Sequence, residues 1–153
     1  MVFKLGELEG VVNALEGVLT QRLPIKAAYW LGKFLKKAQE EAQAFQSGRI
    51  RLCEQYCRKN DKGQSVKMVE GEGGALVETA EGYRGVFRYD FAGISTEDHE
   101  ALDKEFLELA ETEVTFDFKP LTLDQLGDKL EATAEEMAAL QAFIEEPKVA
   151  EAQ

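Results

Sequence analysis

Apolar and small residues recur at helical spacing from Leu23 to Tyr56, which predicts one long helix. They repeat every seven residues in two registers that lie three residues apart. The first register contains Ala28, Leu35, Ala42 and Tyr56, and the second contains Leu31, Ala38, Phe45 and Leu52. Arg49 is the single break in the first register. Two such registers form a seam, the pattern of a helix that packs lengthwise against another helix.

A shorter helix is predicted before it, from Lys4 to Leu19, where leucines and valines form one apolar stripe. Turn residues at 60–63 follow the long helix and predict its end near Lys59. At 1.5 Å per residue, the first helix covers about 24 Å of a partner about 50 Å long. The remaining seam therefore needs either the C-terminal half of the chain or another subunit.

The remaining pattern is mixed. Short strands are predicted at 66–69, 75–78, 83–91 and 114–118, a third helix after Ser95, and a final helix after the capping box of Thr133 and Glu136. The predicted fold class is α+β, a long helical hairpin packed with a small antiparallel sheet and two further helices. We predict a single domain over 1–146, with the hairpin at 1–60, an acidic part at 61–146 and a frayed tail at 147–153.

Charge is distributed unevenly along a chain of ordinary hydrophobic content, 44%. Residues 1–64 contain eleven basic against seven acidic residues, a net charge of +4. Residues 65–153 contain seven against twenty-two, a net charge of −15. The acidic half should repel nucleic acids and membrane surfaces. It is either a solubility feature or a face that binds a basic partner, in the manner of a nucleic-acid mimic.

Catalytic chemistry is poorly represented in this sequence. His99, the one histidine, stands among acidic residues, and no nucleophile motif surrounds any serine or cysteine. Cys53 and Cys57 share a helix face and are expected to be reduced thiols. We expect no catalytic residues, no metal and no cofactor.

Two groups of residues are candidates for partner binding. The long helix carries two aromatic residues followed by two lysines: Tyr29, Trp30, Lys33 and Lys37. Core packing of the aromatics and a solvated lysine face are the alternatives. The third helix carries acidic candidates: Glu97, Glu100, Asp103 and Glu108.

Four segments resemble a family of small proteins encoded by tailed phages and prophages. These segments are 7–15, 23–29, 112–114 and 135–144. The resemblance covers most of the chain except 68–89, and the family has no established activity to carry over. It implies a viral context and maps no functional residues.

The sequence thus predicts a non-catalytic, phage-encoded binding protein whose partner is a protein. In the first hypothesis, it is a virion or assembly component that self-associates through the long helix. In the second, it inhibits a host enzyme or anti-phage defence complex through its acidic surface. The N-terminus meets acidic residues too early for a signal peptide, which predicts an intracellular protein at synthesis. Together with the phage resemblance, this implies the bacterial host cytoplasm at synthesis, or the virion.

Overall fold

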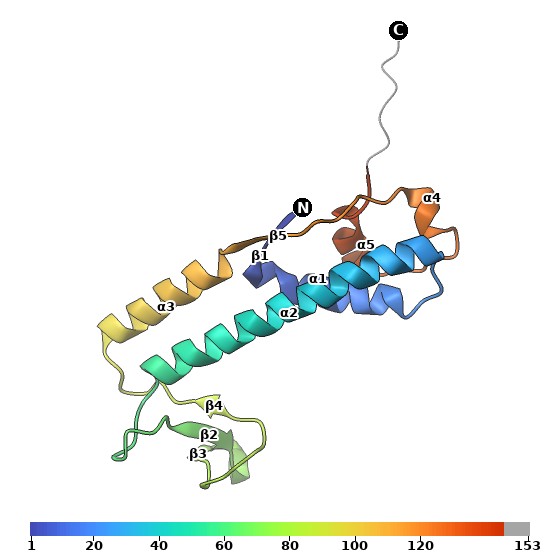
Figure 1. The fold of residues 1–153 in the computed structure, drawn as a ribbon. Coiled ribbons are helices and arrows are strands. Elements are labelled where there is room, and N and C mark those ends of the chain that lie inside the picture. Colours follow the sequence, from blue (N-terminus) through green and yellow to red (C-terminus); the bar gives the residue numbers. More distant parts are fainter. Residues whose placement is uncertain (146–153) are drawn as a thin grey trace. The chain divides into compact units, whose positions relative to one another are not determined.

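The structure is a computed structural model that describes residues 1–145, and it has the predicted α+β fold (Figure 1). The predicted tail at 147–153 lies outside the described residues. The helices are α1 (Leu5–Leu19), α2 (Ile25–Tyr56), α3 (Thr96–Ala110), α4 (Leu123–Leu126) and α5 (Ala134–Gln141), with a short 3₁₀ turn, η1 (Glu72–Gly74). The strands are β1 (Val2–Lys4), β2 (Lys67–Glu70), β3 (Leu76–Glu78), β4 (Arg88–Tyr89) and β5 (Glu113–Thr115).

Contacts within the chain divide it into two compact units. Unit 1 combines residues 1–45 with the chain from Ala110 onward, and unit 2 comprises residues 46–109. The boundary falls within α2, which begins in unit 1 and ends in unit 2. The sequence predicts the boundary between the hairpin and the acidic part at residue 60, which differs from the boundaries of these units. That boundary stays a prediction.

Unit 1 is built around five phenylalanine rings. Phe34 of α2 is central, with its ring centroid 4.6 Å from those of Phe116 and Phe143. Phe3 and Phe118 extend the cluster at 5.7 and 5.9 Å from Phe34. The tilted and edge-on ring angles are those that aromatic quadrupoles favour. These rings tie β1, α2, the segment after β5 and the turn after α5 into one core.

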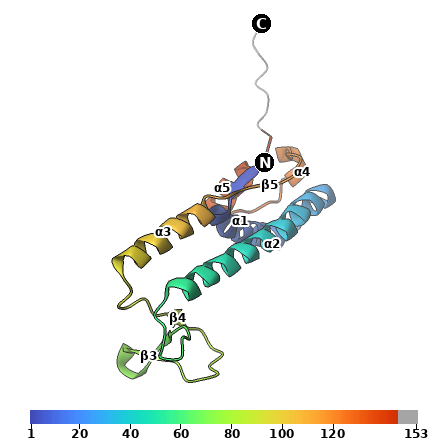
Figure 2. The same ribbon diagram turned by 60° about the vertical axis from the view of Figure 1, so that its left-hand side comes forward.

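Unit 1 contains β1, α1, the first part of α2, β5, α4 and α5 (Figure 2). α1 lies antiparallel to the first part of α2 in both ribbon views, which is the predicted helical hairpin. β1 pairs antiparallel with β5, with Phe3 opposite Val114. The start of α1 lies close to Ala110, because Gly6 has no side chain there. A Cβ at Gly6 would lie only 3.2 Å from the Cβ of Ala110.

Unit 2 joins a helix pair to a three-stranded antiparallel sheet of order β3-β2-β4. α3 lies along the end of α2: Leu109 meets Gly48, and the Arg49 guanidinium carbon lies 5.4 Å from the Phe106 ring centroid. The Ser95 hydroxyl accepts a hydrogen bond from the Asp98 amide at 3.1 Å, the predicted cap of this helix.

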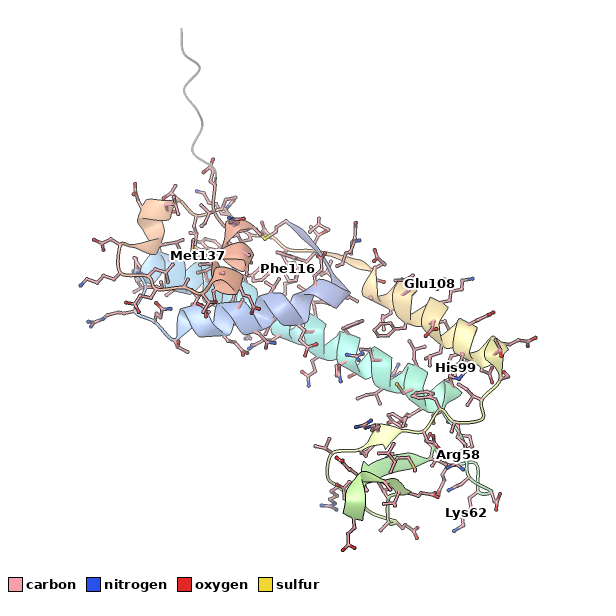
Figure 3. The ribbon with its side chains drawn as sticks, turned by 180° about the vertical axis from the view of Figure 1, so that it is seen from behind. Arg58, Lys62, His99, Glu108, Phe116 and Met137 are labelled. Atoms are coloured by element: carbon pink, nitrogen blue, oxygen red, sulfur yellow. The ribbon has the colours of Figure 1, made fainter. Side chains whose placement is uncertain are left out.

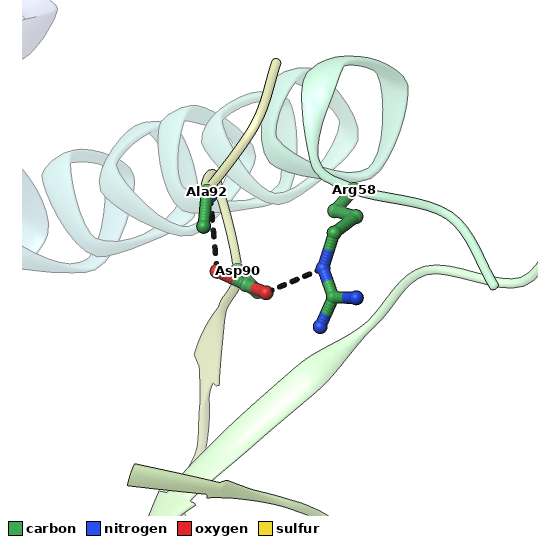
Figure 4. Close-up of polar contacts among 3 residues, drawn as sticks. All are labelled: Arg58, Asp90 and Ala92. Atoms are coloured by element: carbon green, nitrogen blue, oxygen red, sulfur yellow. Dashed lines mark hydrogen bonds and ion pairs between the residues drawn. The ribbon is translucent and has the colours of Figure 1, made fainter.

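Asp90 connects the sheet to the end of α2 (Figure 4). Arg58 Nε lies 2.6 Å from Asp90 Oδ2, and the Ala92 amide donates to Asp90 Oδ1 at 3.0 Å. The backbone of Asp90 also accepts from the Arg58 amide and donates to the Val66 carbonyl. The Ala92 hydrogen bond and then the Arg58 guanidinium lower the pKa of Asp90 below its usual value.

Several sequence predictions are confirmed and others are wrong in detail. The buried or half-buried seam and the Thr133–Glu136 capping box are as predicted. The strand predicted at 83–91 is reduced to β4, because glycines and exposed side chains surround it, and the strand predicted at 114–118 ends at Thr115. β1 was not predicted, since three residues show too little alternation. α3 now covers the end of the seam, so an uncovered seam no longer argues for a second subunit.

We predict that Phe45→Ala lowers the free energy of unfolding by about 3–5 kcal/mol, because the Phe45 side chain is 6% exposed and truncation leaves a cavity. Urea denaturation measures the change. Tyr29→Ala is the matched control on the same helix, since Tyr29 is 60% exposed, and it should cost about 1 kcal/mol or less. Equal effects of the two substitutions would show that the seam is wrongly assigned.

We also predict that Asp90→Asn flattens the acid side of the stability profile. The folded pKa of Asp90 lies below its unfolded value, so its stabilisation is present at neutral pH and is lost as the pH falls through the folded pKa. Urea midpoints between about pH 7 and about pH 3 should fall less steeply in the variant. Asp61→Asn, in the exposed turn after α2, is the control; a matching flattening there would contradict the assignment.

Candidate functional site

A small cleft opens in unit 1 beside the first half of α2. Its volume is about 250 Å³, and its lining comes from α2 and the segment after β5: Trp30, Lys33, Phe34, Lys37, Phe116, Asp117 and Phe118. Pockets for whole small-molecule ligands usually measure about 300–1,000 Å³. The size therefore suits one or two side chains of a partner better than a small organic molecule.

The floor of this cleft is part of the core. Phe34, Phe116 and Phe118 are buried and belong to the phenylalanine cluster (Phe116 is labelled in Figure 3). Phe116 and Phe118 lie on the same side of an extended segment because successive side chains there point to opposite faces. The cleft is thus preorganised, since its rings cannot move without repacking unit 1.

Two lysines form the charged rim of the cleft. Lys33 Nζ lies 5.4 Å from the Trp30 ring centroid, and Lys37 Nζ lies 5.1 Å from that of Phe116. Lys37 Nζ also donates to the Thr115 carbonyl at 3.3 Å. These cation–π contacts hold the ammonium groups over apolar rings while both side chains stay exposed. A partner surface that presents acidic groups next to an apolar side chain would complement this combination.

The charge of α2 changes sharply near the cleft. Residues 25–37 contain four lysines and no acidic residue, a net charge of +4 within a chain whose total is −11. Asp117 is the acidic residue in the lining, so the lining itself carries two positive charges and one negative. The cleft is therefore a basic surface on an acidic protein, which favours acidic partners.

The acidic candidates lie together on α3 of unit 2. Glu97, Glu100, Asp103 and Glu108 are all exposed (Glu108 is labelled in Figure 3). The helix has six acidic residues and one lysine, a net charge of −5 with His99 neutral. Leu107 is 59% exposed and shares a helix face with Glu100 and Asp103, which precede it by seven and four residues. This face combines negative charge with one apolar side chain.

Two larger hollows have a different character. One of about 840 Å³ in unit 2 is lined mainly by the turns at 60–65 and 78–83, with charged side chains of both signs. The other, of about 810 Å³, lies between α1 and α5 of unit 1. The first is lined by turn backbone and charges of both signs, and the second by glutamates and small side chains, so neither combines an aromatic floor with a basic rim.

The groups considered for chemistry are separate from the cleft. His99 is exposed near the start of α3 (Figure 3). Cys57 is buried and Cys53 is half-buried. Burial raises the pKa of the Cys53 thiol. Burial and then the hydrogen bond to Glu54 raise the pKa of Tyr89 to about 12. Within residues 1–145, no three His, Cys, Asp or Glu side chains are grouped to hold a metal.

The structure thus brings together Trp30, Lys33 and Lys37, while Tyr29 packs edge-on to Trp30 at 5.4 Å and stays exposed. Sequence reasoning missed the role of Phe34, Phe116 and Phe118, although the alternation at 114–118 and the helical spacing of Trp30 and Phe34 were visible. The sequence does not show that α2 lies beside β5 and the segment after it, about eighty residues further along the chain. The Lys37–Thr115 hydrogen bond is one contact between these two parts of the chain.

No family model, curated protein or solved structure matches this chain. The phage resemblance accordingly stays a prediction from the sequence. In the described part of the chain, no helix is both long and apolar enough to cross a membrane.

We predict that Lys33→Ala and Lys37→Ala each change the free energy of unfolding by about 1 kcal/mol or less, because both side chains are exposed. Phe34→Ala, in the floor of the same cleft, should cost about 3–5 kcal/mol. Urea denaturation compares the three. If either lysine substitution lowered the free energy of unfolding as much as Phe34→Ala, the rim would have to be part of the core.

Proposed function

We propose that this chain is a non-catalytic, phage-encoded protein-binding protein that self-associates as a virion or assembly component. The cleft on α2 carries the proposal. It joins a preorganised aromatic floor to two exposed lysines, and it is sized for side chains of a protein partner. Aromatic residues in such pockets are where binding energy concentrates in protein interfaces.

The viral context comes from the sequence resemblance described above, and the host cytoplasm at synthesis or the virion is its proposed location. The partner is a protein, with no membrane and no direct nucleic-acid binding by the acidic half. The proposed partner-binding residues on α2 are Tyr29, Trp30, Lys33 and Lys37.

The alternative function is inhibition of a host enzyme or defence complex by the acidic face of α3. The exposure of Glu97, Glu100 and Asp103 on one short helix favours it. Such a face would compete with nucleic acid for a basic groove on the host protein.

We predict that light scattering gives a mass above the 17.1 kDa monomer at micromolar concentrations and low salt. Association should decrease as salt rises, since screening shortens the reach of surface charges to about 8 Å at physiological ionic strength. A strict monomer at every concentration would contradict self-association. Salt-sensitive capture of a host nucleic-acid-binding protein by that monomer, lost on reversal of the α3 acids, would support the inhibitor instead.

A further inference from the structure

We propose that the occupant of the α2 cleft is the acidic face of α3 from a second copy of this chain. The inference rests on the proposed self-association and names the two surfaces that make it. One copy supplies Lys33 and Lys37 above the aromatic floor, and the other supplies Glu100, Asp103 and Leu107.

The charges of the two surfaces are complementary. The α2 segment 25–37 has a net charge of +4, and α3 has a net charge of −5. The two lysines stand four residues apart on their helix, about 6 Å along its axis. Glu100 and Asp103 stand three residues apart, about 4.5 Å along theirs. Each lysine can therefore face one carboxylate when the two helices lie side by side.

The apolar parts are complementary too. Leu107 lies one turn beyond Asp103 on the same face, and its side chain is 59% exposed and so free to contact a partner. The cleft offers an aromatic floor within about 250 Å³, which is room for one such side chain. Leu107 would pack on the rings of Phe34, Phe116 and Phe118, while the two lysines pair with Glu100 and Asp103 in the preceding turns of α3.

The contact joins two different surfaces, so it is heterologous. Each pair of copies leaves one cleft and one acidic helix unoccupied at its ends. Further copies can add until the array closes as a ring or grows as a filament. Exposed ion pairs are individually weak, so the association is reversible and sensitive to salt.

The test uses paired charge reversals in the full chain. Lys33→Glu with Lys37→Glu should weaken self-association by roughly tenfold or more in sedimentation or light-scattering dilution series, and Glu100→Lys with Asp103→Lys should do the same. The controls are Lys36→Glu, on α2 outside the cleft, and Glu9→Lys, exposed on α1; neither should have a comparable effect. Circular dichroism checks that every variant is folded.

Mixing the two reversed variants gives the decisive result. In each variant alone, the altered surface faces a surface of like charge. In the mixture, the acidic cleft of the first variant can face the basic α3 of the second, and the unaltered cleft of the second can face the unaltered α3 of the first. Both contacts are attractive, so the mixture should regain association above the 17.1 kDa monomer mass, with copies of the two variants alternating. Each variant alone should remain monomeric at the same concentration.

A second, uncharged variant keeps the proposal testable if reversal disturbs folding. Leu107→Ser removes the apolar anchor and should weaken association without changing net charge. Emission from Trp30, the sole tryptophan, should change on dilution in the unaltered protein and not in this variant. Undiminished association in all these variants would overturn the cleft–helix contact while leaving self-association intact. A monomer before any substitution would overturn both.

Discussion

Unit 1 is held together where five phenylalanine rings from four separate chain segments meet. Phe3 comes from the first strand and Phe34 from the long helix. Phe116 and Phe118 come from the segment after β5, and Phe143 comes from the turn that follows α5. Burying one such side chain contributes about 1.5–3 kcal/mol, and well-oriented ring pairs add roughly 0.5–1.5 kcal/mol. This cluster is the buried contact that holds the segment after β5 against α2, and the exposed Lys37–Thr115 hydrogen bond adds to it.

The same rings make the cleft a rigid feature of the surface. Its floor is core, so the orientation of the floor is decided by the packing of the whole unit and not by a loop. Its rim is two long, exposed lysine side chains whose ammonium groups rest above aromatic faces. A rigid apolar floor gives shape, and a charged rim gives orientation and rate of encounter. This division of roles is common in interfaces between proteins.

Much of the helical structure could be predicted from the sequence. The seven-residue repeat located α2, and the Thr133–Glu136 pair located the start of α5, because both signals are local. The strands were harder: β1 and β5 are three residues each, and their pairing joins residues more than a hundred positions apart. The acidic candidates were visible as a charge run, whereas the cleft required knowing that residues 116–118 return to α2.

The arrangement of the two units along the chain has a consequence for synthesis. Unit 2 is a continuous stretch, 46–109, inserted between the two parts of unit 1. On the ribosome, all of unit 2 emerges before β5, Phe116 and Phe143 exist to complete the phenylalanine cluster. The N-terminal hairpin must therefore wait with Phe34 unburied, which reverses the usual order in which N-terminal domains fold first. An early-formed unit 2 would help, because it shortens the effective loop that the closing of unit 1 must span.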